Sequence, residues 1–415
     1  MTAKAASPPR AVWLAAIGLT IALAAGWLSY QSYRYFADPG AVGERAISPG
    51  AIDVHNRHDE VHSWFAGEPV YKMYKDAVYP PASYAIFAIA LRPLPWEPTK
   101  ILWFAASLVS AVILSRQLVR HSLARSRLER IFIGVMPFGL YATGAALGNG
   151  QLVLFVLPVV LAALLRLGRP ELSRRDLWLG SLLMLAALVQ PTIAAPFFWL
   201  VLFRSPGVKP AVLVVAGYVL LTAFALAFQM RALPRSGGNA DPVGVMDTWV
   251  NRAQGGTYYG SVLGGYGTVH DLMVEFGMQQ WNSVASLAIL VLAGIWLFRH
   301  RRGDLWLVIG VTAIVARVWT YHRWYDDLLL VLPLLSLFRL VRMPDAGRRT
   351  RLAATAIFLW IWVFLLPPGV LYTLPAPEIP VAIQVTGWLV GLAFLVGVAE
   401  ARRGHPATSD RPPGA

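Results

Sequence analysis

Residues 11–30 read AVWLAAIGLTIALAAGWLSY, twenty residues without a charged side chain. A hydrocarbon core about 30 Å thick is crossed by about 20 apolar residues in a helix, so this stretch predicts a membrane-spanning helix. Lys4 and Arg10 precede it, as basic residues precede a signal peptide. The run is longer than the roughly 7–15 apolar residues of a signal peptide, so we expect an uncleaved first helix. Cleavage after the small residues near Ala24 is the alternative.

The composition extends this prediction to the whole chain of 415 residues, which is 57% hydrophobic and only 14% charged. Soluble proteins carry about 25% charged residues. The apolar residues form uninterrupted blocks rather than the alternating pattern of a β-barrel, so we expect an all-α polytopic membrane protein. Residues 1–399 would form one membrane domain, and residues 400–415 a disordered cytoplasmic tail. The absence of cysteine excludes disulfides, thiolate metal sites and cysteine nucleophiles.

The blocks predict about twelve transmembrane helices. The candidate spans are 11–30, 101–119, 131–148, 151–167, 177–189, 191–203, 210–228, 282–298, 305–320, 326–341, 352–366 and 380–399.

The basic residues set the expected orientation, because cytoplasmic loops are enriched in lysine and arginine. With both termini inside, the inner segments hold 24 of the 36 lysines and arginines. The net charge of +14 is therefore a topology signal and does not indicate nucleic-acid binding. The large outer segments are then 31–100 and 229–281.

Two segments are ambiguous in length. Residues 82–91 are too few to cross, and Pro93 follows, so we expect a re-entrant or surface helix in the first outer loop. Residues 177–203 are long for one helix and contain Gln190-Pro191, which predicts a tight helical pair. A kinked single helix is the alternative and would invert the topology downstream. We see no internal repeat of the kind many transporters have.

This topology gathers the polar groups near apolar runs on the outer side. Polar groups at membrane depth are costly and usually face a cavity or a partner, so we expect one polar pocket there. Its candidate residues are Asp53, Tyr79, Asn149, Gln151, Gln190, Tyr258, Tyr259, Arg317, Tyr321, His322 and Arg323.

Several motifs occur in order along residues 10–340, and together they resemble the polyprenyl-phosphate-sugar-dependent glycosyltransferases of family 87, in the GT-C superfamily. That family includes bacterial polyprenyl-phosphomannose mannosyltransferases. The motifs are an acid after the first span (Asp53), Gly67 to Tyr71, Tyr79-Pro80-Pro81, Gly-Asn-Gly-Gln at 148–151, Gln190-Pro191 and an aromatic and histidine patch at 319–325.

The resemblance implies a GT-C-like helical bundle that transfers a sugar, mannose by default, at the outer face of the cytoplasmic membrane. The donor would be a polyprenyl-phosphate sugar and the acceptor a glycolipid or glycan. We expect no cofactor, and the sequence leaves metal dependence open. Asp53 falls where the family has its base, and His322 where it has a late histidine. Arg57 and His58 replace two aromatics that the family normally has.

The residues themselves fit this chemistry. An inverting transfer needs a base on the acceptor and cations for the leaving phosphate, which Arg317, His322 and Arg323 could supply. The alternatives are Asp59 or Glu60 as base, pairing of the arginines with Asp326 and Asp327, and zinc binding by His55, His58 and His62. A transporter or flippase of lipid-linked sugars, or a non-catalytic assembly subunit, is the alternative function.

Overall fold

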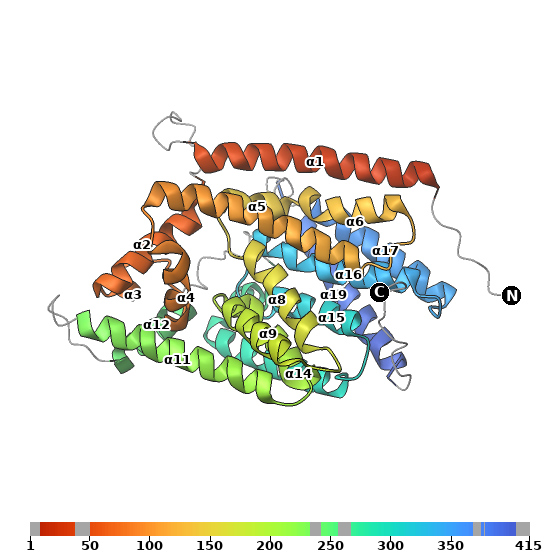
Figure 1. Cartoon of the computed structure of the whole chain (residues 1–415). Coiled ribbons are helices and arrows are strands. Elements are labelled where there is room, and N and C mark those ends of the chain that lie inside the picture. The colour runs from red at the N-terminus through yellow and green to blue at the C-terminus, as the bar shows by residue number, and fades with distance from the viewer. Residues whose placement is uncertain are drawn as a thin grey trace.

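The computed structural model of the protein describes residues 9–37, 50–232, 242–255, 267–367, 375–376 and 378–403. Within these ranges the chain is helical and contains no strand (Figure 1), which confirms the all-α prediction. The elements are α1 (Arg10–Phe36), α2 (Ile52–Ala66), α3 (Val70–Met73), α4 (Pro81–Leu91), α5 (Trp96–His121), α6 (Arg127–Gly139), α7 (Tyr141–Asn149), α8 (Val153–Leu167), α9 (Arg174–Ala187), α10 (Pro191–Arg204), α11 (Lys209–Ala232), α12 (Pro242–Gly255), α13 (Val269–Glu275), η4 (Gln279–Trp281), α14 (Asn282–Arg299), α15 (Leu305–Val318), η5 (Trp324–Leu330), α16 (Val331–Arg342), α17 (Arg348–Leu365) and α19 (Glu378–Ala401).

Five of the described helices are long and apolar enough to cross a membrane, which supports a membrane protein. They lie in residues 10–36, 96–121, 209–230, 279–299 and 379–401. Most of the other predicted spans correspond to helices of 12 to 15 residues, shorter than the roughly 20 that a straight crossing needs. The figure of twelve spans therefore stays a prediction.

The span predicted at 131–148 is bent rather than straight. Helices α6 and α7 meet at an angle of 47°. Leu140 between them has an extended backbone, and the Thr143 hydroxyl donates to the Pro137 carbonyl at 2.5 Å. Proline inside α6 disturbs the helical hydrogen bonds, so the bend has a local cause. The predicted break at Gln190-Pro191 is also present, since α9 ends at Ala187 and α10 begins at Pro191.

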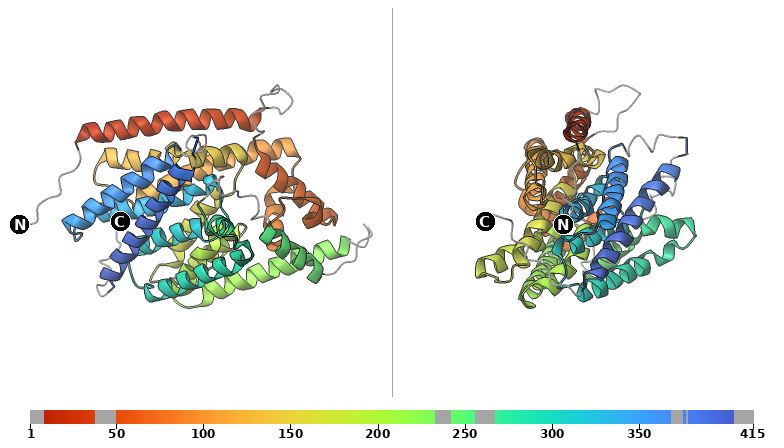
Figure 2. Two further views of the ribbon diagram at one scale, coloured as in Figure 1. Left: turned by 180° about the vertical axis from the view of Figure 1, so that it is seen from behind. Right: turned by 90° about the vertical axis from the view of Figure 1, so that its right-hand side faces the viewer.

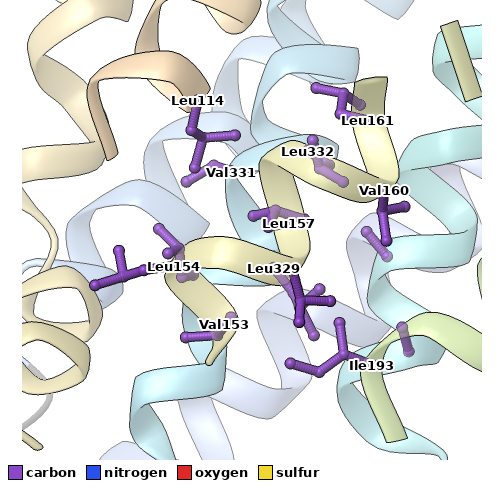
Figure 3. Packing of buried hydrophobic residues seen from close by; sticks show 14 of the residues in the cluster. Leu114, Val153, Leu154, Leu157, Val160, Leu161, Ile193, Leu329, Val331 and Leu332 are labelled. Atoms are coloured by element: carbon purple, nitrogen blue, oxygen red, sulfur yellow. The ribbon is translucent and has the colours of Figure 1, made fainter. Parts of the chain in front are cut away.

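The core is one continuous cluster of buried hydrophobic side chains, to which α8 and α16 contribute many aliphatic members. Figure 3 shows Leu157 of α8 packed among residues of α16 and η5, including Leu332 and Leu329. Helices α1 and α11 lie along opposite edges of the bundle in both views (Figures 1 and 2) and expose apolar side chains such as Leu19 and Leu220. Exposed apolar faces of this kind are suited to lipid.

The loops predicted to share the inner side do contact one another. Arg342 pairs with Glu129 at 2.9 Å, which joins segments 339–351 and 116–130, and Arg204 donates to the Gly303 carbonyl at 2.9 Å. Figure 1 shows α2, α3, α4 and α12 gathered at one end of the bundle, while α1 begins at the other end. The predicted first outer loop thus forms a helical cap, and α4 within it is an 11-residue helix that ends at Leu91.

Candidate functional site

The site begins where α2 docks onto the turn between α7 and α8. The Ala51 amide donates to the Gly148 carbonyl at 2.8 Å, and the Trp103 indole donates to the Gly150 carbonyl at 3.1 Å. Gly150 has φ of +73°, and a Cβ there would lie 2.6 Å from Cγ1 of Val54. Only glycine combines this backbone conformation with such a close approach, so the predicted Gly-Asn-Gly-Gln turn is built to receive α2.

Asp53 lies in the first turn of α2 and touches this turn directly. Its Oδ2 accepts a hydrogen bond from Nε2 of Gln151, and the neighbouring Asn149 accepts one from Arg34 at the end of α1. Burial raises the pKa of Asp53, while the positive charges of Arg57 and Arg323 and the Gln151 hydrogen bond lower it. The structure therefore brings together Asp53, Gln151 and Arg323, which the sequence placed in three separate segments.

Arg57 and Glu60 form a buried ion pair on the same face of α2, with 2.5 Å between Nη2 and Oε1. The Arg57 guanidinium also donates to the Asp76 carbonyl at 3.2 and 3.3 Å and lies 4.8 Å from the centre of the Tyr79 ring. Burial raises the pKa of Glu60 to about 7, an effect that Arg57 and a hydrogen bond from Tyr84 oppose. Tyr79 is thus part of the wall beside Asp53.

Arg317 has a different environment from the other predicted cations. Its Nε donates to Oδ1 of Asp327 at 2.5 Å, and both side chains are fully buried. Gln384 donates to the second oxygen of Asp327 at 3.2 Å, and the Arg317 guanidinium lies 4.8 Å from the ring centre of Trp388. Arg317 is therefore held in an internal ion pair with Asp327.

His322 and Arg323 lie in the extended stretch before η5. His322 is buried, and its Nδ1 lies 3.0 Å from Oδ2 of Asp326, which also accepts from the Arg323 amide at 3.2 Å. Nε2 of His322 is buried without a hydrogen-bond partner in the described structure, and buried polar groups are normally paired. The Arg323 side chain is half-buried and its Nε donates to the Tyr321 hydroxyl.

The two halves of the site meet around Asp53. Helix α7 packs against η5, and the Arg323 charge acts on Asp53 across about 270 residues of chain. Burial raises the pKa of Tyr79, and the charges that act on it include Arg57, Asp53 and Asp326. One polar cluster therefore holds a carboxylate from the first predicted outer loop and Arg323 from the late segment.

The remaining predicted residues are less connected to this cluster. Gln190 is the N-terminal flanking residue of α10, buried, with its Oε1 unpaired among the described residues. Tyr258 and Tyr259 lie outside the residues that the structure describes.

The three histidines of α2 make ring contacts instead of a ligand set. His55 stacks on Trp96 with 4.3 Å between ring centres, and the His58 and His62 rings lie 4.4 Å apart. Within the described ranges no three histidine, cysteine, aspartate or glutamate side chains are placed to hold a metal ion.

An apolar groove of about 320 Å³ opens beside the site between α4, α5, α8 and α9. Its walls include Ala90, Ala106 and Phe155, and it reaches Trp103 and Leu152, which flank the Gly150-Gln151 turn. Ala90 and Ala106 are exposed at its rim. The groove thus runs from the apolar exterior of the bundle to side chains that adjoin the turn bonded to Asp53.

Sequence reasoning missed two residues of this site. Arg34 is the last-turn arginine of α1 and reaches Asn149, and Arg57 was read only as a departure from a family pattern. The spacing of Asp53, Arg57 and Glu60 by four and three residues puts all three on one helical face and could have indicated the cluster.

Comparison of the chain with protein-family models, with curated proteins and with solved structures finds no match.

Proposed function

We propose that the protein is a membrane glycosyltransferase that moves a sugar from a polyprenyl-phosphate carrier to a hydroxyl of a glycolipid or glycan at the outer face of the cytoplasmic membrane. The observation that carries the proposal is the position of Asp53, whose carboxylate accepts from Gln151 and interacts with the charges of Arg57 and Arg323. His322 precedes Arg323 in the chain and pairs with Asp326. A carboxylate facing cations is the arrangement that transfer from a phosphate leaving group requires.

The proposed step balances as a single inverting displacement. Asp53 takes the proton of the acceptor hydroxyl, the acceptor oxygen bonds to the anomeric carbon, and the bond from that carbon to the phosphate oxygen breaks. The phosphate leaves with the electron pair, stabilised by Arg323 and Nε2 of His322, whose ring Asp326 orients. Gln151 holds one oxygen of Asp53 and so turns the other toward the acceptor.

The groove supports a lipid-linked substrate. It is lined almost entirely by apolar side chains, it is open toward the bundle exterior at Ala90 and Ala106, and its walls include Leu152, the neighbour of Gln151. An isoprenoid chain in such a groove would present its head group near Asp53. The default sugar is mannose, by the resemblance of the ordered motifs to family 87.

Mass spectrometry of lipid-linked and envelope glycans, with and without the gene, tests the proposal. Loss of one sugar residue is expected on deletion, with return on complementation by the wild-type gene. Asp53→Asn should express and fold but lower transfer by about 10²–10⁴-fold. The matched control is Asp59→Asn on the exposed side of the same helix, which should transfer normally.

Two outcomes would overturn the proposal. Wild-type transfer by purified Asp53→Asn protein would show that Asp53 is not the base. Glycans unchanged by deletion, together with movement of an intact lipid-linked sugar between leaflets in reconstituted vesicles, would show a flippase instead.

A further inference from the structure

Arg57 is held unusually firmly for an arginine at the edge of a substrate site. Its Nη2 lies 2.5 Å from Glu60, both terminal nitrogens donate to the Asp76 carbonyl, and its guanidinium lies over the Tyr79 ring. The side chain is almost fully buried. Glu60, in turn, is fixed by the Tyr84 hydroxyl at 3.0 Å. The guanidinium of Arg57 is therefore held in place by Glu60, Asp76 and Tyr79 together.

The clamp keeps Arg57 near Asp53 without bonding to it. The two residues are four apart on α2 and so lie on one face, yet the guanidinium is ion-paired with Glu60 and donates its hydrogen bonds to the Asp76 carbonyl. The described part of the chain places no hydrogen bond on Oδ1 of Asp53, while Oδ2 accepts from Gln151. A direct ion pair would have covered the oxygen that a base needs.

We propose that Arg57 is a positioning residue for Asp53: clamped by Glu60 and Asp76, it supplies a fixed positive charge one helical turn from the carboxylate while leaving one carboxylate oxygen open to the acceptor hydroxyl. The proposal rests on the proposed function for the role of Asp53 as base. Glu60 acts through Arg57, by holding it away from the base.

Charged and polar groups from every neighbouring element bear on Asp53. Arg57 on α2 and Arg323 before η5 lower its pKa, as does the hydrogen bond from Gln151, whereas burial and Asp76 raise it. Arg34 of α1 also interacts with the carboxylate. Arg57 is the strongest of the charges that oppose burial, so its removal should raise the pKa of Asp53 further.

The two members of the clamp should therefore act in opposite directions. Arg57→Gln removes the charge, so the acidic limb of the pH profile of kcat/KM should move to higher pH. Glu60→Gln frees Arg57 to turn toward Asp53, so the limb should move to lower pH while kcat falls because Oδ1 is covered. A merely structural pair would give the same loss of folded protein for both variants and no opposite shifts.

The first experiment measures sugar transfer against pH by purified full-length protein in lipid nanodiscs. Arg57→Gln is expected to lower kcat at pH 7 about tenfold or more, with KM for donor and acceptor within threefold, and Arg57→Lys to restore part of the rate. Arg92→Gln is the matched control, because Arg92 also lies over an aromatic ring, Phe65, on the cap. Shifts in the same direction for Arg57→Gln and Glu60→Gln would overturn the proposal.

A second measurement separates this inference from the proposed function. Dicyclohexylcarbodiimide modifies protonated carboxyl groups in apolar surroundings, and peptide mass spectrometry gives the pH at which Asp53 is half labelled. That pH should rise in Arg57→Gln and fall in Glu60→Gln, whether or not the protein transfers sugar. An unchanged midpoint overturns the inference, whereas a moved midpoint in a protein without transferase activity overturns only the function.

Discussion

Arg57 and Arg317 are both buried arginines paired with a carboxylate at 2.5 Å, yet they belong to different kinds of surroundings. Arg317 and Asp327 are sealed inside the bundle, and Gln384 completes the pair. Arg57 and Glu60 lie in the cap, respectively one and two helical turns from the partly exposed Asp53. An ion pair alone therefore does not show that an arginine has only a structural role. Arg57 differs from Arg317 because the carboxylate of Asp53 lies one helical turn away from it.

The largest expected effect tests the sealed pair. Asp327→Asn would leave the Arg317 charge buried without its counter-charge, which costs about 3–5 kcal/mol of folding free energy. Thermal unfolding of purified protein should show this loss. The double variant Arg317→Met, Asp327→Leu should be more stable than Asp327→Asn, and equal stability of the two would contradict an ion pair that serves only the fold.

Arg323→Gln should show the contrasting behaviour. Arg323 is half-buried, and its removal should leave the unfolding temperature close to that of the wild type while lowering transfer by about 10²–10³-fold, as loss of one transition-state charge contact does. Tyr321→Phe is the control, because it removes only the hydroxyl that accepts from Arg323. A variant that is less stable but keeps its activity per folded molecule would show that Arg323, like Arg317, serves the fold.

Gly150→Ala tests the joint that brings the cap to the bundle. The positive φ and the contact with Val54 together should cost about 1–3 kcal/mol and displace the first turn of α2. Gly207→Ala is the matched control, because Gly207 also has positive φ but no atom within 4 Å of an added Cβ. Equal activity losses in the two variants would mean that strain, and not the docking of α2, is responsible.

Gln151→Ala should give the smallest effect. It removes a hydrogen bond that lowers the pKa of Asp53, so this pKa should rise and the acidic limb of the pH profile of transfer should move to higher pH. Asn149→Ala is the control, because Asn149 bonds to Arg34 instead. A larger shift of the acidic limb in Asn149→Ala than in Gln151→Ala would show that Arg34, at the end of α1, has more influence on the pKa of Asp53 than Gln151 has.

The sequence predicted the helical class, the break at Gln190-Pro191 and the gathering of Asp53 with the 148–151 turn and Arg323, because charge distribution and proline placement act over long stretches. It did not predict the bend at Leu140, where Pro137 lies inside α6 and the Thr143 hydroxyl donates to the Pro137 carbonyl. Nor could it divide the roles of two nearby arginines.

The different roles of Arg317 and Arg323 depend on backbone geometry that the spacing of residues in the sequence does not reveal. Arg317 lies in the last turn of α15, and its partner Asp327 lies ten residues later in a 3₁₀ segment, so their contact crosses an extended stretch. Arg323 lies inside that stretch and faces the cap.

The bond between Asp53 and Gln151 also has a consequence for biosynthesis. The two residues are 98 positions apart, so at about 5–20 residues per second the ribosome delivers Gln151 roughly 5–20 s after Asp53. Arg323 follows later still. During that interval α2 has no turn to dock on, and its carboxylate remains an ordinary acid in water. The polar cluster is therefore completed only when most of the helices have been made, so that an incompletely synthesised chain carries an unassembled site.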